Sequence, residues 1–193
     1  ILLVNFKLRH IYVFSIKKLM KSKENLVFLG MMGSGKTSIG SLVAKKLKLD
    51  FFDIDDCIEM KLNMKISKIF EEKGEKFFRT FEEKATLDVL KKKNTVIALG
   101  GGAFLNTNIR REILINHLSF WLKLDTKTLI NRIIKSSKRP IAFKSSKSEL
   151  AEMINNRNKL YSKALFKVDC NNLTKIKIVN NILNIYDDQE TIC

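Results

Sequence analysis

The fold of this chain is decided by residues 30–37, which read Gly-Met-Met-Gly-Ser-Gly-Lys-Thr and match the pattern G-x-x-x-x-G-K-S/T. An apolar stretch, 26–29, precedes this run, and apolar residues at helical spacing follow it over 39–47. A strand therefore ends and a helix begins at the run, which is the context that makes it a phosphate-binding loop. The alternative is a glycine-rich turn that binds nothing, and the two flanking elements argue against it.

The loop predicts a binding site for a nucleoside triphosphate. Its glycines let successive backbone N–H groups point inward, and the positive end of the following helix adds to their attraction for anionic oxygens. We expect the Lys36 ammonium to reach the β- and γ-phosphates and the Thr37 hydroxyl to bind Mg²⁺.

Apolar runs that alternate with helical patterns predict a single α/β domain. Strands are expected at 26–29, 50–55, 95–99, 118–122 and 166–169. Helices are expected at 36–48, 58–62, 66–72, 75–92, 107–115, 126–134 (capped by Thr126), 149–163 and 174–186. This alternation implies a parallel sheet covered by helices on both faces. Ligands bind such sheets at the carboxyl ends of the strands, where Gly30, 53–55 and 100–102 should converge.

The composition of the 193 residues argues against several classes of protein. The net charge is +16, but the lysines are scattered and no basic and aromatic cluster stands out, so we expect no nucleic-acid partner. Cys57, Cys170 and Cys193 lie far apart without metal-type spacing, which predicts a reducing compartment, the cytoplasm. No apolar run reaches the length of a membrane span. We expect a monomer without a membrane partner.

Residues 1–19 differ in composition from the rest. They carry four basic residues, no acidic residue and no clean helical or strand period. We expect an N-terminal extension outside the fold, upstream of a start at Met20, and a single domain over 20–193. An organelle-targeting segment is the alternative.

Asp53 and Asp55 close the second expected strand. Because side chains alternate along a strand, both carboxylates should leave on the same face. Beside a bound triphosphate, one carboxylate can hold Mg²⁺, directly or through water, and the other can accept a proton from an attacking hydroxyl. The alternative is a solvated strand end followed by a helix cap at Asp56.

Cationic and glycine residues further along the chain are candidates for a second binding site. Three glycines, 100–102, follow a buried strand, where the backbone must approach a ligand or a helix closely. Arg79 precedes Glu82 by three residues, a spacing at which the acid can orient the guanidinium on a helix. Arg157 follows on a later helix. Taken singly, each arginine is also compatible with a solvated surface position.

Residues 135–148 are rich in Lys and Ser and contain Pro140, the single proline of the chain. Such a segment has little core-forming content, and we expect it to be a mobile lid. Arg139 lies within it and is a candidate to close over the γ-phosphate.

Together, these motifs resemble shikimate kinase over about residues 23–186. The matching pieces, in order, are GMMGSGKTSIG, DIDDCIE, IFEEKGEKFFRTFEE, LGGGA, the pair Arg139-Pro140, and NNRNKLY. The stretch 69–82 is the most specific, because a generic phosphate-binding loop protein has no reason to carry it. The resemblance implies the P-loop fold of nucleoside-monophosphate kinases, a five-stranded parallel sheet flanked by helices with a lid. It also implies ATP- and Mg²⁺-dependent phosphorylation of the shikimate 3-hydroxyl, on the route to chorismate and aromatic amino acids.

The resemblance also implies how the nucleotide is held. The residues that would wrap the ATP phosphates are Gly33, Ser34, Gly35, Lys36, Thr37 and Ser38. Thr37 would bind Mg²⁺, and Asp53 would hold a metal-bound water. Arg132 would lie near the adenine, and Arg139 would close from the lid onto the phosphates.

For the acceptor, the resemblance implies that Asp55 contacts the ring hydroxyls and helps to deprotonate or orient the attacking one. Arg79 and Arg157 would clamp the shikimate carboxylate, with the Gly101 N–H as a further contact. This agrees with the chemistry of guanidinium, which binds carboxylates in a bidentate manner.

Two departures from the family pattern stand out. Thr174-Lys175 occupies the place where the family often carries Asn-Pro against the adenine, which puts nucleotide selectivity in question. Ile141-Ala142 replaces the leucines that the family prefers after Arg139-Pro140, and we expect this change to be tolerated.

Other functions are compatible with parts of the sequence. A gluconate kinase would share the fold, but the pair Arg79 and Arg157 argues for a carboxylate-bearing ring acceptor. An inactive nucleotide-binding protein or a basic nucleic-acid-associated protein is a further alternative. The presence of Lys36, Thr37 and both carboxylates, Asp53 and Asp55, argues against a dead enzyme.

Overall fold

The computed structural model describes residues 24–135 and 146–190. The expected N-terminal extension, 1–19, lies outside the described residues, as do Met20, Arg139 and most of the expected lid. The lid was expected to run to 148, but the helix that follows it already begins at Lys147, capped by Ser146.

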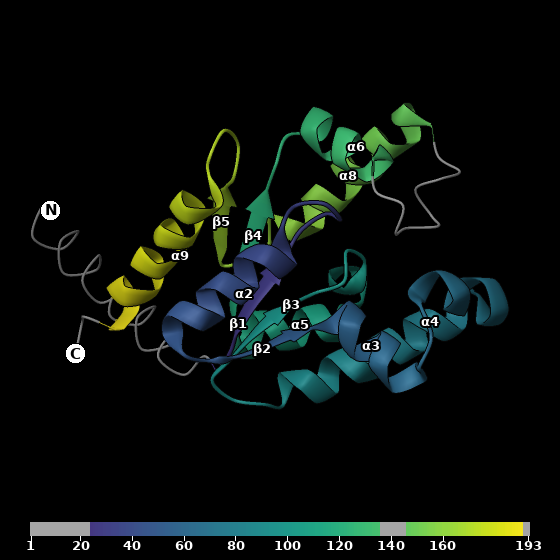
Figure 1. Ribbon diagram of the computed structural model, residues 1–193, viewed down its shortest axis with the longest axis horizontal. Coiled ribbons are helices and arrows are strands. Elements are labelled where there is room, and N and C mark those ends of the chain that lie inside the picture. Colours follow the sequence, from purple (N-terminus) through teal and green to yellow (C-terminus); the bar gives the residue numbers. More distant parts are fainter. Residues whose placement is uncertain (1–23, 136–145, 191–193) are drawn as a thin grey trace, which may run out of the picture.

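A five-stranded parallel sheet forms the centre of the molecule, as the sequence predicts (Figure 1). Its strands are β1 (Leu26–Leu29), β2 (Asp50–Asp53), β3 (Thr95–Ala98), β4 (Leu118–Lys123) and β5 (Phe166–Asp169). Their order is β2-β3-β1-β4-β5. β2 and β3 therefore lie on one side of β1, and β4 and β5 lie on the other. Ligands bind open α/β sheets at such a change in strand order.

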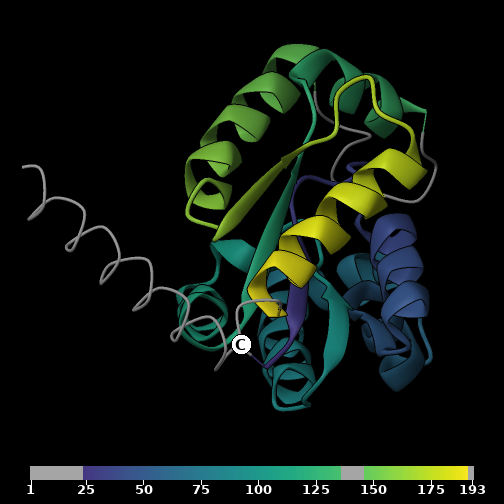
Figure 2. The ribbon, with the colours of Figure 1, turned by 90° about the vertical axis from the view of Figure 1, so that its left-hand side faces the viewer.

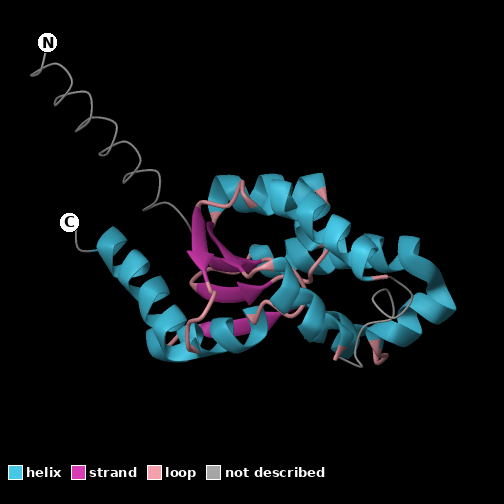
Figure 3. Ribbon diagram, turned by 90° about the horizontal axis from the view of Figure 1, so that it is seen from above, coloured by secondary structure: helices cyan, strands magenta, loops and turns pink. Residues whose placement is uncertain are grey.

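Helices cover both faces of the sheet, so the strands lie in the middle layer (Figure 3). The helices are α2 (Lys36–Leu47), α3 (Ile54–Leu62), α4 (Ile66–Leu90), η1 (Ala103–Leu105, a 3-10 turn), α5 (Thr107–Asn116), α6 (Thr126–Ile134), α8 (Lys147–Tyr161) and α9 (Lys175–Glu190). Helices α2 and α9 contact each other, and α9 also contacts β5 (Figure 2). Helix α5 contacts α4 and β4.

The core is built on strands that are apolar along their whole length. Every residue of β1 and β3 is buried, as expected for strands with helices on both faces. Phe28, Phe120 and Phe166 stack across β1, β4 and β5, with ring centroids 5.5 and 5.0 Å apart. This core fixes the carboxyl ends of the strands from which the functional loops leave.

An expected strand end, an expected helix start and an expected helix cap are wrong because aspartates cap the helices that follow; α3, for example, begins at Ile54 and not at 58. Strand β2 ends at Asp53, not at residue 55, because the Asp53 carboxylate accepts the Asp55 N–H and caps α3. Helix α6 begins at Thr126 as expected, but its cap is Asp125, whose side chain accepts the Thr128 N–H. The predicted break at Gly74 is confirmed, since this residue has φ +77° within α4.

Candidate functional site

The phosphate-binding loop joins β1 to α2 with the conformation that the motif predicts. Gly33 and Gly35 have φ values of +78° and +96°, which other residues rarely adopt. Lys36, only 7% exposed, folds back so that its ammonium donates to the Gly30 and Met31 carbonyls, each at 2.9 Å. The ammonium is therefore held above the loop on the side where the backbone of a phosphate-binding loop receives anionic oxygens.

Thr37 and Asp53 lie side by side at the edge of this loop. The Thr37 hydroxyl donates to Asp53 Oδ2 at 2.6 Å. Two hard oxygen ligands at the mouth of a phosphate site suit Mg²⁺, which takes one or two protein oxygens and completes its shell with phosphates and water. Among residues 24–135 and 146–190, no cluster of three or more His, Cys, Asp or Glu could hold a metal by itself.

Asp55 lies in the first turn of α3, one residue beyond the buried Ile54. The expectation that it shares a strand face with Asp53 is therefore wrong, although both carboxylates remain at the carboxyl end of β2. Asp55 approaches the glycine turn, because a Cβ on Gly100 would lie 2.7 Å from both Asp55 Oδ1 and Glu82 Oε1. Gly100 thus lets two carboxylates from different helices meet at one point.

Glu82 holds Arg79 in place, as the spacing predicts. Arg79 Nη1 donates to Glu82 Oε2 at 2.7 Å, and Glu82 is only 3% exposed. Burial raises the pKa of the Glu82 carboxyl, the Arg79 charge opposes this, and Asp55 adds to the rise. Burial also opposes the charged form of Arg79, but Glu82 outweighs it and raises the Arg79 pKa. The guanidinium is therefore a permanent cation at this site.

Aromatic rings fix the other side of the Arg79 guanidinium. It lies 5.1 Å from the Phe78 ring centroid and 5.9 Å from that of Phe70, distances at which a cation is attracted to the ring face. The sequence places Phe77 beside it as well, but Phe77 stacks with Phe81 instead, at 6.2 Å.

The glycine turn 100–102 connects Arg79 and Arg157 to the phosphate loop. A Cβ on Gly102 would lie 2.6 Å from Arg79 Nη1, and one on Gly101 would lie 3.2 Å from the Met32 nitrogen. Arg157 reaches the turn from α8, with its Nη1 3.3 Å from the Gly101 carbonyl oxygen. The turn therefore brings Arg79 and Arg157 to one place.

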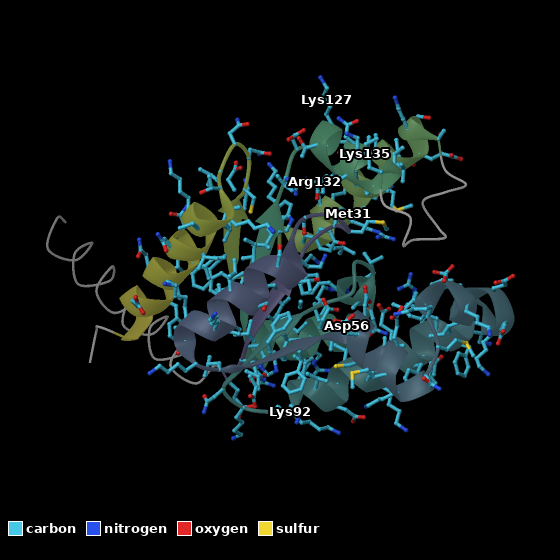
Figure 4. All side chains as sticks on the ribbon, viewed as in Figure 1. Met31, Asp56, Lys92, Lys127, Arg132 and Lys135 are labelled. Atoms are coloured by element: carbon cyan, nitrogen blue, oxygen red, sulfur yellow. The ribbon has the colours of Figure 1, made fainter. Side chains whose placement is uncertain are left out.

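Arg132 lies on the far side of the phosphate loop. It is exposed on α6, and its Nη1 donates to the Gly33 carbonyl at 3.1 Å. In Figure 4, Met31 and Arg132 lie on the side of α6 and α8, whereas Asp56 lies on the side of α3 and α4. Thr174 caps α9 through the Lys177 N–H, at 3.3 Å, which leaves Lys175 as the first residue of that helix.

Tyr161 is a polar side chain of this region to which sequence reasoning gave no role. Its hydroxyl donates to the Gly101 carbonyl, and the ring is buried. The available signal is its spacing, because it follows Arg157 by four residues and so lies on the same face of α8.

Comparison with known proteins agrees with this geometry. The family model described as shikimate kinase matches residues 32–187. The chain belongs to the shikimate kinase family. A member from Bartonella henselae is 34% identical over 179 residues, which is 91% of this chain and 85% of that protein. A member from Bacillus subtilis is 41% identical over 165 residues, which is 83% of this chain and 88% of that protein.

Solved structures also place the chain in this family of small-molecule kinases. Shikimate kinase from Acinetobacter baumannii, in complex with shikimate, has a TM-score of 0.81 and 27% identity, covering 89% of this chain and 97% of that one. A gluconokinase from Sinorhizobium meliloti has a TM-score of 0.55 at 15% identity, which shows a shared fold only. In residues 24–135 and 146–190, no helix has the length and apolar content needed to cross a membrane.

Proposed function

We propose that this chain transfers the γ-phosphoryl group of ATP to the 3-hydroxyl of shikimate, giving shikimate 3-phosphate and ADP on the route to chorismate. The observation that carries the proposal is the convergence on one glycine turn of Asp55, the Glu82-held Arg79 and Arg157, directly beside the phosphate-binding loop. A ring that bears both a carboxylate and several hydroxyls fits two guanidinium groups and one carboxylate better than a neutral sugar does.

On the donor side, the loop N–H groups and Lys36 stabilise the negative charge that develops on the transferred phosphoryl group. Thr37 and Asp53 are the residues that would hold Mg²⁺, Asp53 directly or through a water. When bound, Mg²⁺ neutralises phosphate charge and orients the triphosphate. Arg132 packs against the loop at Gly33, which supports its placement near the nucleotide base.

On the acceptor side, Arg79 and Arg157 bind the carboxylate, and Asp55 accepts the hydroxyl proton as the oxygen attacks the γ-phosphorus. The new bond joins the 3-oxygen to phosphorus, the bond from phosphorus to the β,γ-bridging oxygen breaks, and ADP leaves. The burial of Glu82 supports a role in holding Arg79 at a fixed angle to the substrate.

Some further assignments stay predictions. These are closure of Arg139 over the phosphates, donation by the Gly101 N–H to the substrate, the monomeric state and the cytoplasmic location. Phosphoryl transfer needs cationic stabilisation and exclusion of water, which is the physical reason to expect the first of them.

A coupled ADP-release assay with shikimate, with gluconate and without acceptor tests the proposal. We expect turnover with shikimate and near-background ADP release in the other two arms. A gluconate rate equal to or above the shikimate rate would assign the chain to the alternative kinase. Equal ADP release in all three arms would reject an acceptor site altogether.

A further inference from the structure

Tyr161 is a buried residue whose hydroxyl meets the glycine turn. The side chain is 1% exposed, and its Oη donates to the Gly101 carbonyl across 60 positions of sequence. The ring packs against Phe104 and Trp121, with centroids 6.3 Å away in both cases. A phenylalanine would fill this space equally well, so packing alone gives no reason for the hydroxyl.

The accepting carbonyl lies at a junction between the two substrate sites. Gly101 packs on the phosphate loop at the Met32 nitrogen, and the next residue, Gly102, packs on the Arg79 guanidinium. The peptide that joins Gly101 to Gly102 therefore sets the position of an acceptor-binding arginine relative to the loop. A shift of this peptide would move the acceptor against the donor phosphate, and phosphoryl transfer depends on that geometry.

Two side chains of α8 converge on the same carbonyl. Arg157 Nη1 lies 3.3 Å from the Gly101 oxygen and 3.8 Å from Met31 Sδ, while Tyr161 Oη lies 3.9 Å from the same sulfur. If Arg157 turns toward a substrate carboxylate, its Nη1, already 3.3 Å from the Gly101 oxygen, would move away from the turn. The tyrosine hydroxyl is buried behind it and can keep its own bond to the turn.

We propose that Tyr161 is a positioning residue, whose hydroxyl fixes the 101–102 peptide and thereby sets the acceptor site relative to the phosphate loop when Arg157 engages its ligand. The identity of the substrate in this inference rests on the proposed function. The geometry rests only on the contacts of Tyr161 and the glycine turn. Burial raises the pKa of Tyr161 to about 12, so the hydroxyl keeps its proton and remains a donor throughout the working pH range.

Tyr161→Phe, which keeps the ring and removes one oxygen, tests the proposal. We expect kcat/KM for shikimate to fall about tenfold, because a buried carbonyl loses its donor. The dissociation constant of ADP should stay within about twofold, since the loop itself is not held by this bond. In NMR spectra, the Gly102 amide nitrogen, which shares the peptide with the Gly101 carbonyl, should shift more than the loop amides.

Ser119→Ala is the matched control. Ser119 is fully buried, and its hydroxyl accepts the Leu165 N–H at 2.9 Å, away from the site. Like Tyr161→Phe, it removes a buried hydrogen bond and should lower the melting temperature, but it should leave kcat/KM for shikimate within about twofold. Phe104→Leu, which disturbs the same packing but leaves the Tyr161 hydroxyl, should also keep the ratio of shikimate to ADP affinity.

Several outcomes would overturn the proposal. They are unchanged shikimate kinetics in Tyr161→Phe, an equal loss of ADP affinity, or the same shikimate-specific loss in Phe104→Leu. If Tyr161→Phe fails to fold, the wild-type protein decides: its Tyr161 hydroxyl proton should exchange slowly and give a nuclear Overhauser effect to the Gly102 amide, and rapid exchange would contradict the junction. If the wild-type enzyme does not phosphorylate shikimate, the proposed function fails, while the NMR and ADP measurements still judge the junction.

Discussion

The two edges of the sheet both bury polar side chains, but they do so in different ways. At the amino edge, the Asn25 amide donates to the Leu90 and Lys92 carbonyls, at 3.0 and 2.7 Å, and meets His117 Nδ1 at 3.3 Å. Its oxygen accepts both the N–H and the hydroxyl of Thr95, at 3.1 and 3.0 Å. The Asn25 amide is thus saturated by the protein itself, so it joins strands and has no hydrogen-bonding capacity left for a ligand.

At the carboxyl edge, the polar groups of the site are charged: Lys36, Arg79 and Arg157 lie near Asp55 and Glu82. Lys36 donates to two backbone carbonyls, Arg157 contacts a carbonyl and a sulfur, and Arg79 pairs with the buried Glu82 and the exposed Glu75. Cations that are held by neutral acceptors gain most from an anion. We infer that the neutral Asn25 amide at the amino edge is structural, whereas the charged groups at the carboxyl edge bind ligands.

Lys36→Ala should have the largest effect, because it removes the cation nearest the transferred phosphoryl group. We expect kcat to fall by about a thousandfold or more. The coupled ADP-release assay measures this, with circular dichroism to confirm the fold. Lys45→Ala, on the exposed side of the same helix, is the control and should behave like the wild type. Near-normal turnover in a folded Lys36→Ala protein would refute the role of this edge.

Arg79→Ala should weaken shikimate binding by roughly ten- to a hundredfold, since a charge-assisted hydrogen bond contributes about 1.5–3 kcal/mol. ADP binding should barely change. Arg79→Lys keeps the charge but loses the planar fork, so it should recover only part of the affinity. Calorimetry that finds the same shikimate affinity in all three proteins would show that the carboxylate clamp is misassigned.

Asn25→Ala should have the opposite effect, a loss of stability without a loss of activity. Removal of the amide leaves several buried backbone groups without partners, which costs about 2 kcal/mol or more and lowers the melting temperature by about 5 °C. The shikimate and ATP kinetics at low temperature should stay unchanged. Asn180→Ala, exposed on α9, is the control for stability. A selective loss of activity in Asn25→Ala would end the distinction between the two edges.

The smallest effect concerns alkaline pH. In the folded protein the pKa of Tyr161 is about 12, whereas that of an exposed tyrosine is 10.0. The contribution of the Tyr161 hydroxyl to stability is therefore complete below pH 10.0 and declines as the pH rises toward 12. The unfolding free energy of the wild type, minus that of Tyr161→Phe, should fall by about 1 kcal/mol between about pH 9 and about pH 11. Denaturant titrations measure it. A constant difference would indicate that the hydroxyl is not buried.

Much of the fold followed from the sequence because local and global signals agree. The apolar runs of β1 and β3 are buried throughout, and the phosphate-loop glycines adopt the positive φ values that the motif requires. The pairing of Arg79 with Glu82 was also predictable, since helical spacing alone places the two side chains together.

Other parts of the site depend on contacts that spacing does not encode. The end of β2 was misplaced because Asp53 can continue a strand or cap a helix, and only the packing of Ile54 into the core decides between them. Tyr161 and Asn25 each act across 60 positions or more of sequence. Such long-range partners are set by the topology of the sheet, and the residue types themselves give no sign of them.

The position of the phosphate on the product tests the central claim most directly. The wild-type enzyme is incubated with ATP, Mg²⁺ and shikimate, and the product is examined by phosphorus–proton correlation NMR. We expect the new phosphorus to couple to the ring proton at carbon 3, with one ADP released for each product molecule. A phosphate on another hydroxyl, or ADP release that leaves shikimate unmodified, would contradict it.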